Sequence, residues 1–436
     1  MEKLADFDFT RLEFFKDGTR KNTGDPVAPP GVTDLIVISH GWHQDPESSK
    51  EMYAAIVGHL RDVAKADWNA NGRVFGVAGV FWPSDKFRDD LGQETFNVLG
   101  GAAASAGGNL NEDVLVSLGK EVGDFLGIDE PDFPDRVALA ANGGGDADAL
   151  VVELRAAVGG MEQVDAQTQS DHNELFSRKG SDIVDDLAMQ PAPTLGVAAV
   201  LEGNAAAIVE TEGGEALGLF SGASAGVAKL LNQFAYFELK KRSAKVGLGL
   251  AKVLNEAPGI EKIRVHLIGH SFGARLMTAA TTALKTPPKS LSLVQAAFSH
   301  NAFGENLHYP PFPKFNGDFR DVITARKVDG PIVITYTWHD HAVGLAYPSA
   351  SRVSQTIAAG LVEVSNHFGG GEDIYGGLGA NGALGLGTDA TNIVYGGSSP
   401  LTFAPHHVTN VKCDFIESHT DIRRKELAQL FKAAVA

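Results

Sequence analysis

A serine flanked by glycines stands where an apolar run meets a helix-forming run. Residues 265–274 read VHLIGHSFGA and continue into RLMTAATTAL. In a strand–G-x-S-x-G–helix segment the sharp turn exposes the serine oxygen above the sheet, and the glycines are needed because a Cβ would collide with neighbouring backbone. The helix amino terminus favours negative charge that develops there. The segment predicts that Ser271 is a nucleophile and that His270 lies beside the substrate.

A second G-x-S-x-G stands at residues 222–226, which read GASAG. The preceding residues, ALGLFS, make a poor strand, so a buried helix or a Gly/Ser loop explains this match better. Ser271 is therefore preferred to Ser224 as the nucleophile.

An earlier apolar run also ends in a glycine loop. Residues 35–45 read LIVISHGWHQD. A loop after an early strand can supply a backbone N–H to an oxyanion hole, and Gly41 would let this loop approach the reacting carbon. Trp42 is the predicted donor from this loop and Phe272 the second. His40, Gly41 and Trp82, which ends the next apolar run, are predicted to line the substrate pocket.

Six nearly continuous apolar runs are typical of buried parallel strands. They cover residues 34–39, 74–82, 263–268, 291–298, 331–337 and 408–415. Helical patterns cover residues 48–66, 237–254, 274–284 and 421–434. The alternation predicts an α/β fold with a mostly parallel central sheet and helices on both faces.

The chain resembles the α/β-hydrolase family. Within it, the chain is similar to a microbial branch with four motifs, which here read HGW at 40–42, WPS at 82–84, GHSFGA at 269–274 and D-x-A-V-G…YP-x-A-S at 340–351. The resemblance leaves the long inserted segment unexplained. It implies an α/β-hydrolase fold and the chain order serine, acid, histidine.

The acid is expected directly after a late strand, where a carboxylate can orient the catalytic histidine. Asp340 follows the run PIVITYT. Asp329 precedes that run and therefore lies at the wrong end of the sheet. The remaining rivals, Asp318 and Asp321, lie in the preceding loop.

The base is expected after the last strand. His419 lies between the run VTNVKCDF and the C-terminal helix, whereas His406 and His407 precede that run. His419 is therefore the predicted base. A solvated loop histidine is the alternative, because the chain has 14 histidines.

A metal site is the rival interpretation of the same region. Suitable ligand types occur at His43, His339, Asp340, His341, His406 and His407. Their spacing matches no sharp metal motif, and a serine elbow needs no metal. We therefore expect neither a metal nor a cofactor.

A long segment interrupts the alternation of strands and helices. Residues 93–231 carry helical patches at 112–126, 147–158 and 182–189 but no strong strand. We expect a helical cap inserted into a core made of 1–92 and 232–436; a partly disordered excursion is the alternative. A second excursion covers 341–405, and its Gly-rich stretch at 370–387 predicts an irregular loop.

The composition excludes several classes of partner. The 54 acidic and 37 basic side chains give a net charge of -17 over 436 residues, which argues against nucleic acid and against a polybasic membrane dock. Cys413 is the single cysteine, so an intrachain disulfide is impossible. No signal peptide or spanning segment is evident, which favours a cytoplasmic location. The oligomeric state stays open.

These observations together predict a serine hydrolase that cleaves carboxylic esters. Ser271, His419 and Asp340 would be its triad, and an acyl-enzyme its intermediate. Amide or peptide hydrolysis by the same residues is the first alternative. A non-catalytic binding or scaffold protein on the same fold is the second.

Overall fold

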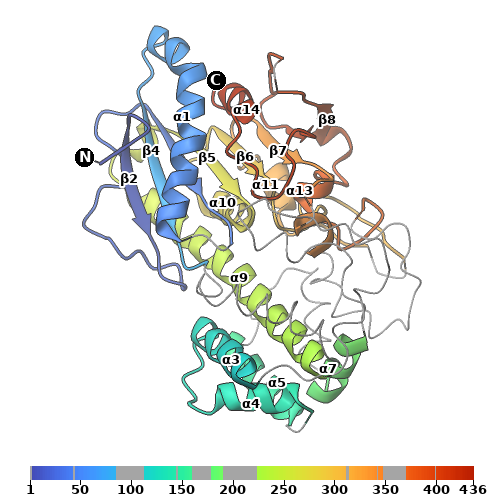
Figure 1. Cartoon of the computed structure of the whole chain (residues 1–436). Helices are drawn as coiled ribbons and strands as arrows, with labels where there is room; N and C mark the ends of the chain where they lie inside the picture. The colour runs from blue at the N-terminus through green and yellow to red at the C-terminus, as the bar shows by residue number, and fades with distance from the viewer. Residues whose placement is uncertain are drawn as a thin grey trace. The chain divides into compact units, whose positions relative to one another are not determined.

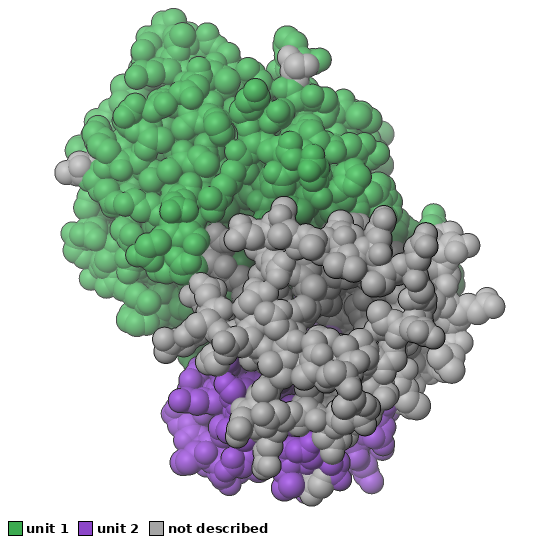
Figure 2. Space-filling view, in the orientation of Figure 1, with its two compact units in different colours: residues 1–84, 240–348, 366–436 green, residues 85–239, 349–365 purple. Residues whose placement is uncertain are grey.

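A computed structural model of the whole chain describes residues 2–42, 45–84, 112–143, 146–159, 178–189, 223–310, 314–340, 342–346, 370–397 and 399–436. The chain divides into two compact units (Figure 2): unit 1 comprises 1–84, 240–348 and 366–436, and unit 2 comprises 85–239 and 349–365. The functional division into a hydrolase core and an inserted cap stays a prediction.

Unit 1 is built on a nine-stranded sheet in the described part of the chain. Its order is β1-β2-β4-β3-β5-β6-β7-β9-β8, and every neighbouring pair is parallel except β1 and β2. The strands are β1 (Glu2–Leu4), β2 (Phe7–Glu13), β3 (Asp34–Ser39), β4 (Phe75–Phe81), β5 (Arg264–His270), β6 (Ser290–Val294), β7 (Ile332–Tyr336), β8 (Ala390–Val394) and β9 (Val408–Lys412). The predicted α/β fold with a mostly parallel sheet is confirmed.

Helices cover both faces of this sheet (Figure 1). On one face, α1 (Pro46–Ala70) and α14 (Glu426–Ala434) pack together and share a core with strand side chains such as Ile36 and Ile38. Side chains alternate along a strand, so the intervening Val37 points to the other face. There α10 (Phe272–Ala283) packs on β3, β5 and β6. Burial on both faces explains why these strands read as continuous apolar runs.

Local signals account for the helix boundaries. Asp45 caps α1, because its side chain accepts a hydrogen bond from the Ser48 N–H at 2.8 Å, and Pro46 occupies the first helical turn.

The helix α9 (Ala223–Glu256) begins well before the predicted 237 and contributes residues to both units. Shorter elements complete unit 1: η2 (Ile260–Lys262), α11 (Arg320–Thr324), a π-turn η3 (Ala342–Ala346), α13 (Leu378–Asn381) and η4 (Gly387–Asp389).

The described part of unit 2 is helical. Its helices are α3 (Glu112–Leu126), α4 (Phe133–Ala141), α5 (Ala147–Val158) and α7 (Gly180–Met189), together with the first residues of α9. Arg136 on α4 pairs with Glu153 on α5 at 2.6 Å, and Asp146 caps α5 through the N–H groups of Asp148 and Ala149. The helical patches predicted inside the inserted segment are therefore present; α4 was not predicted.

Three strands lie where none was predicted. β1 and β2 form one edge of the sheet, and β8 forms the other, within the excursion 341–405 and shortly after its Gly-rich stretch. Among the described strands, β8 pairs with β9 alone, and its residues Thr391 and Asn392 are exposed. An edge strand of this kind needs no continuous apolar run, so its sequence carries little strand signal.

Among the described helices, not one combines the length and the apolar character that crossing a bilayer requires.

Candidate active site

The predicted site residues follow neighbouring parallel strands. β3, β5, β6, β7 and β9 lie side by side in the sheet and run in the same direction. The carboxyl ends of parallel strands meet at one edge, where open α/β sheets place their ligands. The predicted residues Gly41, Ser271, Asp340 and His419 all follow these strands, so the topology brings them to the same edge; Gln295, which was not predicted, follows β6.

Ser271 occupies the turn between β5 and α10. Its φ of 57° and ψ of -125° lie where non-glycine residues are rare. A Cβ on Gly269 would collide with the carbonyl oxygen of Gly273, and a Cβ on Gly273 with that of His40. The turn is held by hydrogen bonds from Ser271 N–H to the Val294 carbonyl at 3.1 Å and from Ala297 N–H to the Ser271 carbonyl at 3.2 Å. The two glycines therefore permit the tight turn.

A hydrogen-bonded chain joins Ser271, His419 and Asp340. Ser271 Oγ lies 2.9 Å from His419 Nε2, and His419 Nδ1 lies 2.9 Å from Asp340 Oδ2. A carboxylate only accepts hydrogen bonds, so Nδ1 carries the proton and Nε2 is left to accept from the serine hydroxyl. The arrangement can deprotonate the hydroxyl and stabilise the imidazolium that forms.

The residues after Asp340 fold back onto its carboxyl group. Val343 N–H donates to Asp340 Oδ1 at 3.0 Å, and Gly344 N–H donates to the Asp340 carbonyl at 2.8 Å. Asp340 is completely buried, whereas the His419 side chain is 15% exposed. A buried carboxylate requires such donors. The D-x-A-V-G pattern is therefore explained by hydrogen bonds to its own aspartate.

The loop after β3 lies directly against the serine. A Cβ on Gly41 would collide with Ser271 Cβ and lie 3.0 Å from its Oγ. The rings of Trp42 and Phe272 meet edge-on, 6.2 Å apart. Trp42 thus contacts the side chain of Phe272, which follows Ser271 directly and begins α10. Donation by their backbone N–H groups to an oxyanion stays a prediction.

His40 is buried beneath this loop and is held by its neighbours. Its Nδ1 donates to the Gly41 carbonyl at 2.9 Å, its Nε2 accepts from Trp82 N–H at 3.4 Å, and its ring stacks on Trp82. The backbone N–H of His40 donates to Tyr53 Oη at 2.8 Å. Burial lowers the pKa of His40 to about 4. His40 is thus a neutral support for the loop, and the interactions link the HGW and WPS motifs.

His270 anchors the backbone of His419. Its Nε2 donates to the His419 carbonyl at 2.9 Å, and the two rings are 4.8 Å apart. Burial, followed by the proximity of His419, lowers the pKa of His270 well below its usual value. Like His40 and Trp82, His270 is at most 5% exposed. The lining of a substrate pocket by these residues stays a prediction.

The rival residues lie elsewhere in the fold. Ser224 lies in the first turn of α9, within unit 2. Asp329 precedes β7 and pairs with Lys289 at 2.6 Å, His406 Nδ1 donates to the Val328 carbonyl, and His407 Nε2 lies 2.8 Å from Thr391 Oγ1. The partners of Asp329, His406 and His407 are therefore residues outside the hydrogen-bonded chain around Ser271.

The described residues also bear on metal and thiol chemistry. Among them, no group of three or more His, Cys, Asp or Glu side chains is arranged to hold a metal ion; His43 and His341 lie outside those residues. Cys413 is buried, and burial raises the pKa of its thiol to about 12. It therefore carries no appreciable thiolate at neutral pH, and the thiolate is the reactive form.

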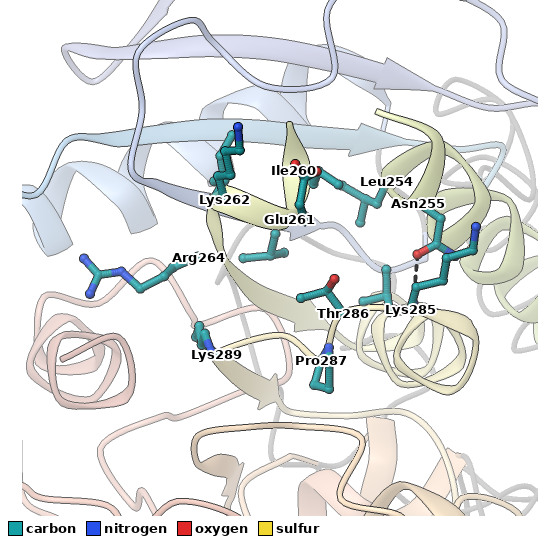
Figure 3. Close-up of a pocket in the computed structure, with 13 residues that line it drawn as sticks. Leu254, Asn255, Ile260, Glu261, Lys262, Arg264, Lys285, Thr286, Pro287 and Lys289 are labelled. Carbon is teal, nitrogen blue, oxygen red and sulfur yellow. Dashed lines mark hydrogen bonds between the residues drawn. The ribbon is translucent and has the colours of Figure 1, made fainter. Parts of the chain in front are cut away.

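A surface cavity of 220 Å³ lies at the other end of β5 (Figure 3). It is lined by residues at the beginning of β5, such as Arg264, and beyond the end of α10, such as Lys285. Lys262 and Arg264 extend in different directions in Figure 3 and do not converge on one point. Five further residues of β5 lie between Val265, the last strand residue of the lining, and Ser271, a span of about 20 Å. It is therefore not the site described above.

Comparisons with protein-family models, with curated proteins and with solved structures found no match to this chain.

Gln295 also belongs to the hydrogen-bonded group around Asp340, although it was not predicted from the sequence. Its amide donates to Asp340 Oδ2 at 2.9 Å, and its side chain is fully buried. The available signal was a single polar residue that interrupts the apolar run LSLVQAAF. Such a residue at the carboxyl end of a buried strand is a candidate for the site, because burial requires that its polar atoms be paired.

The buried histidines predict a loss of stability in mild acid. Burial lowers the pKa values of His40 and His300 to about 4, so below their ordinary value of about 6.5 only the unfolded chain takes up these protons. The stability that these two neutral histidines contribute is thus fully present above pH 6.5 and decreases as the pH approaches 4. At pH 5 the free energy of unfolding is lower by about 2 kcal/mol for each histidine.

Urea unfolding at pH 8, 6 and 5 measures this effect. His300→Gln is the matched variant, because it removes one of the buried histidines whose pKa is lowered, and His300 lies outside the hydrogen-bonded chain of Ser271, His419 and Asp340. It is expected to show a weaker dependence on pH. Equal unfolding free energies of the wild-type protein at pH 8 and pH 5 would contradict the prediction.

Proposed function

We propose that the protein is a serine hydrolase of the α/β-hydrolase type that cleaves carboxylic esters. The observation that carries the proposal is the chain Ser271 Oγ–His419 Nε2 and His419 Nδ1–Asp340 Oδ2, both at 2.9 Å, on a strained strand-to-helix turn. The order serine, acid, histidine along the chain also suits this family.

The proposed reaction begins with attack of Ser271 Oγ on the ester carbonyl. His419 Nε2 takes the hydroxyl proton and then donates it to the leaving alkoxide, while Asp340 holds Nδ1 and stabilises the imidazolium. Backbone N–H groups of Trp42 and Phe272 are proposed to hold the oxyanion; one such donor typically contributes about 3–4 kcal/mol. Water, activated by His419, then hydrolyses the acyl-enzyme and releases the acid.

The inserted segment is proposed to restrict access to this site. Its described part is helical, as suits a cap over a substrate pocket. The same triad geometry also serves amide hydrolysis, so the choice of ester must be tested with substrates.

Hydrolysis of p-nitrophenyl esters from acetate to palmitate tests the proposal, together with labelling by a fluorophosphonate probe. We expect ester turnover and a single probe adduct on the peptide that contains Ser271. Turnover of p-nitroanilides but not of esters would favour the amidase alternative. A folded protein that neither turns over substrate nor reacts with the probe would favour the scaffold alternative.

A matched pair of glycine variants tests the role of the loop after β3. Gly41→Ala is expected to lower ester turnover by about 100-fold, because the new Cβ displaces either the loop or Ser271. Gly58→Ala is the control: Gly58 lies within α1, and its new Cβ would lie 3.4 Å from Ala5 Cβ, an ordinary van der Waals distance. Steady-state kinetics of both variants gives the comparison. Equal activities would show that the close approach of Gly41 is unimportant.

A further inference from the structure

We infer that Gln295 is a positioning residue that holds the carboxylate of Asp340 in its productive orientation. The inference rests on the proposed function, because the productive orientation is the one that serves His419 and Ser271.

Gln295 is placed by the sheet between the nucleophile and the acid. It directly follows β6, which lies between β5 and β7. Its φ is +44° although it is not a glycine, and its side chain is fully buried. Such a backbone conformation persists only where the surroundings enforce it, and it concentrates at functional sites. The backbone of Gln295 is therefore bent so that its side chain reaches toward the end of β7.

The hydrogen bonds of Gln295 determine the orientation of its amide. Nε2 donates to Asp340 Oδ2 at 2.9 Å and to the Gly379 carbonyl at 3.1 Å, both of which only accept. Oε1 accepts from Thr335 Oγ1 at 3.1 Å, and Thr335 Oγ1 accepts in turn from Gln295 N–H at 3.2 Å. A flipped amide would present an oxygen to two acceptors, so only one orientation is compatible with these neighbours.

Among the described residues, this amide is one of three donors to the carboxyl group of Asp340. Oδ2 receives Gln295 Nε2 and His419 Nδ1, while Oδ1 receives Val343 N–H. With three donors in place, rotation of the carboxyl group would break at least one charge-assisted hydrogen bond. Oδ2 is therefore kept pointing at His419 before the imidazolium forms.

A neutral donor suits this position better than a cation. Lysine or arginine would also bind the carboxylate, but its positive charge would oppose formation of the imidazolium on His419. A glutamine amide orients the carboxylate and adds no net charge. The chemistry of the side chain thus agrees with a positioning role.

Two substitutions of Gln295 distinguish positioning from simple packing. Gln295→Met keeps the volume and removes both donors. Gln295→Glu keeps the shape and places a second carboxyl group beside Asp340. We expect this pair to hold one shared proton near neutral pH, because burial and the neighbouring carboxylate both disfavour a second negative charge. The protonated form can still donate to Asp340, whereas the fully ionised pair repels.

Asn410 provides the matched control. It is also a buried amide, and it binds the segment next to Gly379: its Nδ2 donates to the Ala383 carbonyl at 2.9 Å, and its Oδ1 accepts from Ala383 N–H at 2.8 Å. Its Nδ2 also donates to Asn392 Oδ1 at 2.8 Å, so these bonds hold Ala383 and Asn392 rather than Asp340. Asn410→Leu therefore tests loss of a buried amide from the same part of the fold.

The variants are compared by p-nitrophenyl acetate kinetics between pH 5.5 and pH 9, with thermal unfolding measured in parallel. We expect Gln295→Met to lower kcat by about 10- to 100-fold with KM nearly unchanged, since a small misplacement costs this much. Gln295→Glu is expected to be active near neutral pH and to lose activity at alkaline pH, where the wild-type protein does not. Asn410→Leu should keep the wild-type pH profile.

A Gln295→Glu profile parallel to that of the wild-type protein would overturn the inference, even if Gln295→Met failed to fold. So would equal losses of kcat in Gln295→Met and Asn410→Leu. If the wild-type protein neither hydrolyses esters nor reacts with the fluorophosphonate probe, the proposed function fails instead. The pH titration of labelled His419 by NMR then still reports the geometry, and an unchanged titration in Gln295→Glu would overturn the inference.

Discussion

Ser271→Ala is expected to abolish ester hydrolysis and labelling by fluorophosphonate, with a loss of turnover of at least about 10⁴-fold. The variant removes the only oxygen that lies 2.9 Å from His419 Nε2 in the described hydrogen-bonded chain. It should fold normally, because removing one hydroxyl leaves the backbone of the turn and its hydrogen bonds to Val294 and Ala297 in place.

Ser224→Ala is the control for this prediction, since it removes the other serine in a G-x-S-x-G pattern. Ser224 is a helical residue of α9, whereas Ser271 precedes the first residue of α10, so the Ser224 variant should be labelled and should turn over ester like the wild-type protein. Loss of labelling in Ser224→Ala with retention in Ser271→Ala would reverse the assignment of the nucleophile.

His419→Ala is expected to lower kcat by about 10³- to 10⁶-fold, because the serine then has no base and the leaving group has no acid. His407→Ala is the matched control. That histidine lies 2.8 Å from Thr391 Oγ1 beside the edge strand β8, so its removal should change kcat by less than about twofold. Ester turnover measured at saturating substrate compares the two variants.

The double variant Ser271→Ala/His419→Ala sharpens this comparison. Residues that act as one unit lose their effect together, so the double variant should be hardly less active than either single variant. Additive losses would show that Ser271 and His419 act independently. Near-normal turnover by His419→Ala would remove the histidine from the mechanism.

The strand pattern was largely predictable because burial acts on each residue locally. Residues 34–39 were predicted as a strand and form β3 with the same limits. The polar edge strand β8 was missed, since pairing with β9 and not burial specifies it. The alternating β2, with its burial changing from residue to residue, escaped a search for continuous apolar runs.

In the site, too, some residues have a local sequence signal and others depend on distant parts of the chain. The need for Gly269 could be interpreted locally, because its Cβ would collide with Gly273 in the same turn, whereas a Cβ on Gly273 would collide with the carbonyl of His40, which follows a different strand. Gln295 could not, since its importance depends on Asp340, which follows a different strand 45 positions later. Its positive φ is likewise imposed by its surroundings and has no local signal.

The sequence alone determined which segments form the buried strands and where the tight strand-to-helix turn lies, because these features depend on residues only a few positions apart. Only the tertiary structure decided that β6 lies between β5 and β7, and that His419 meets a serine 148 positions earlier in the chain. Strand order and loop closure bring these residues together, and both are properties of the whole sheet that local patterns do not contain.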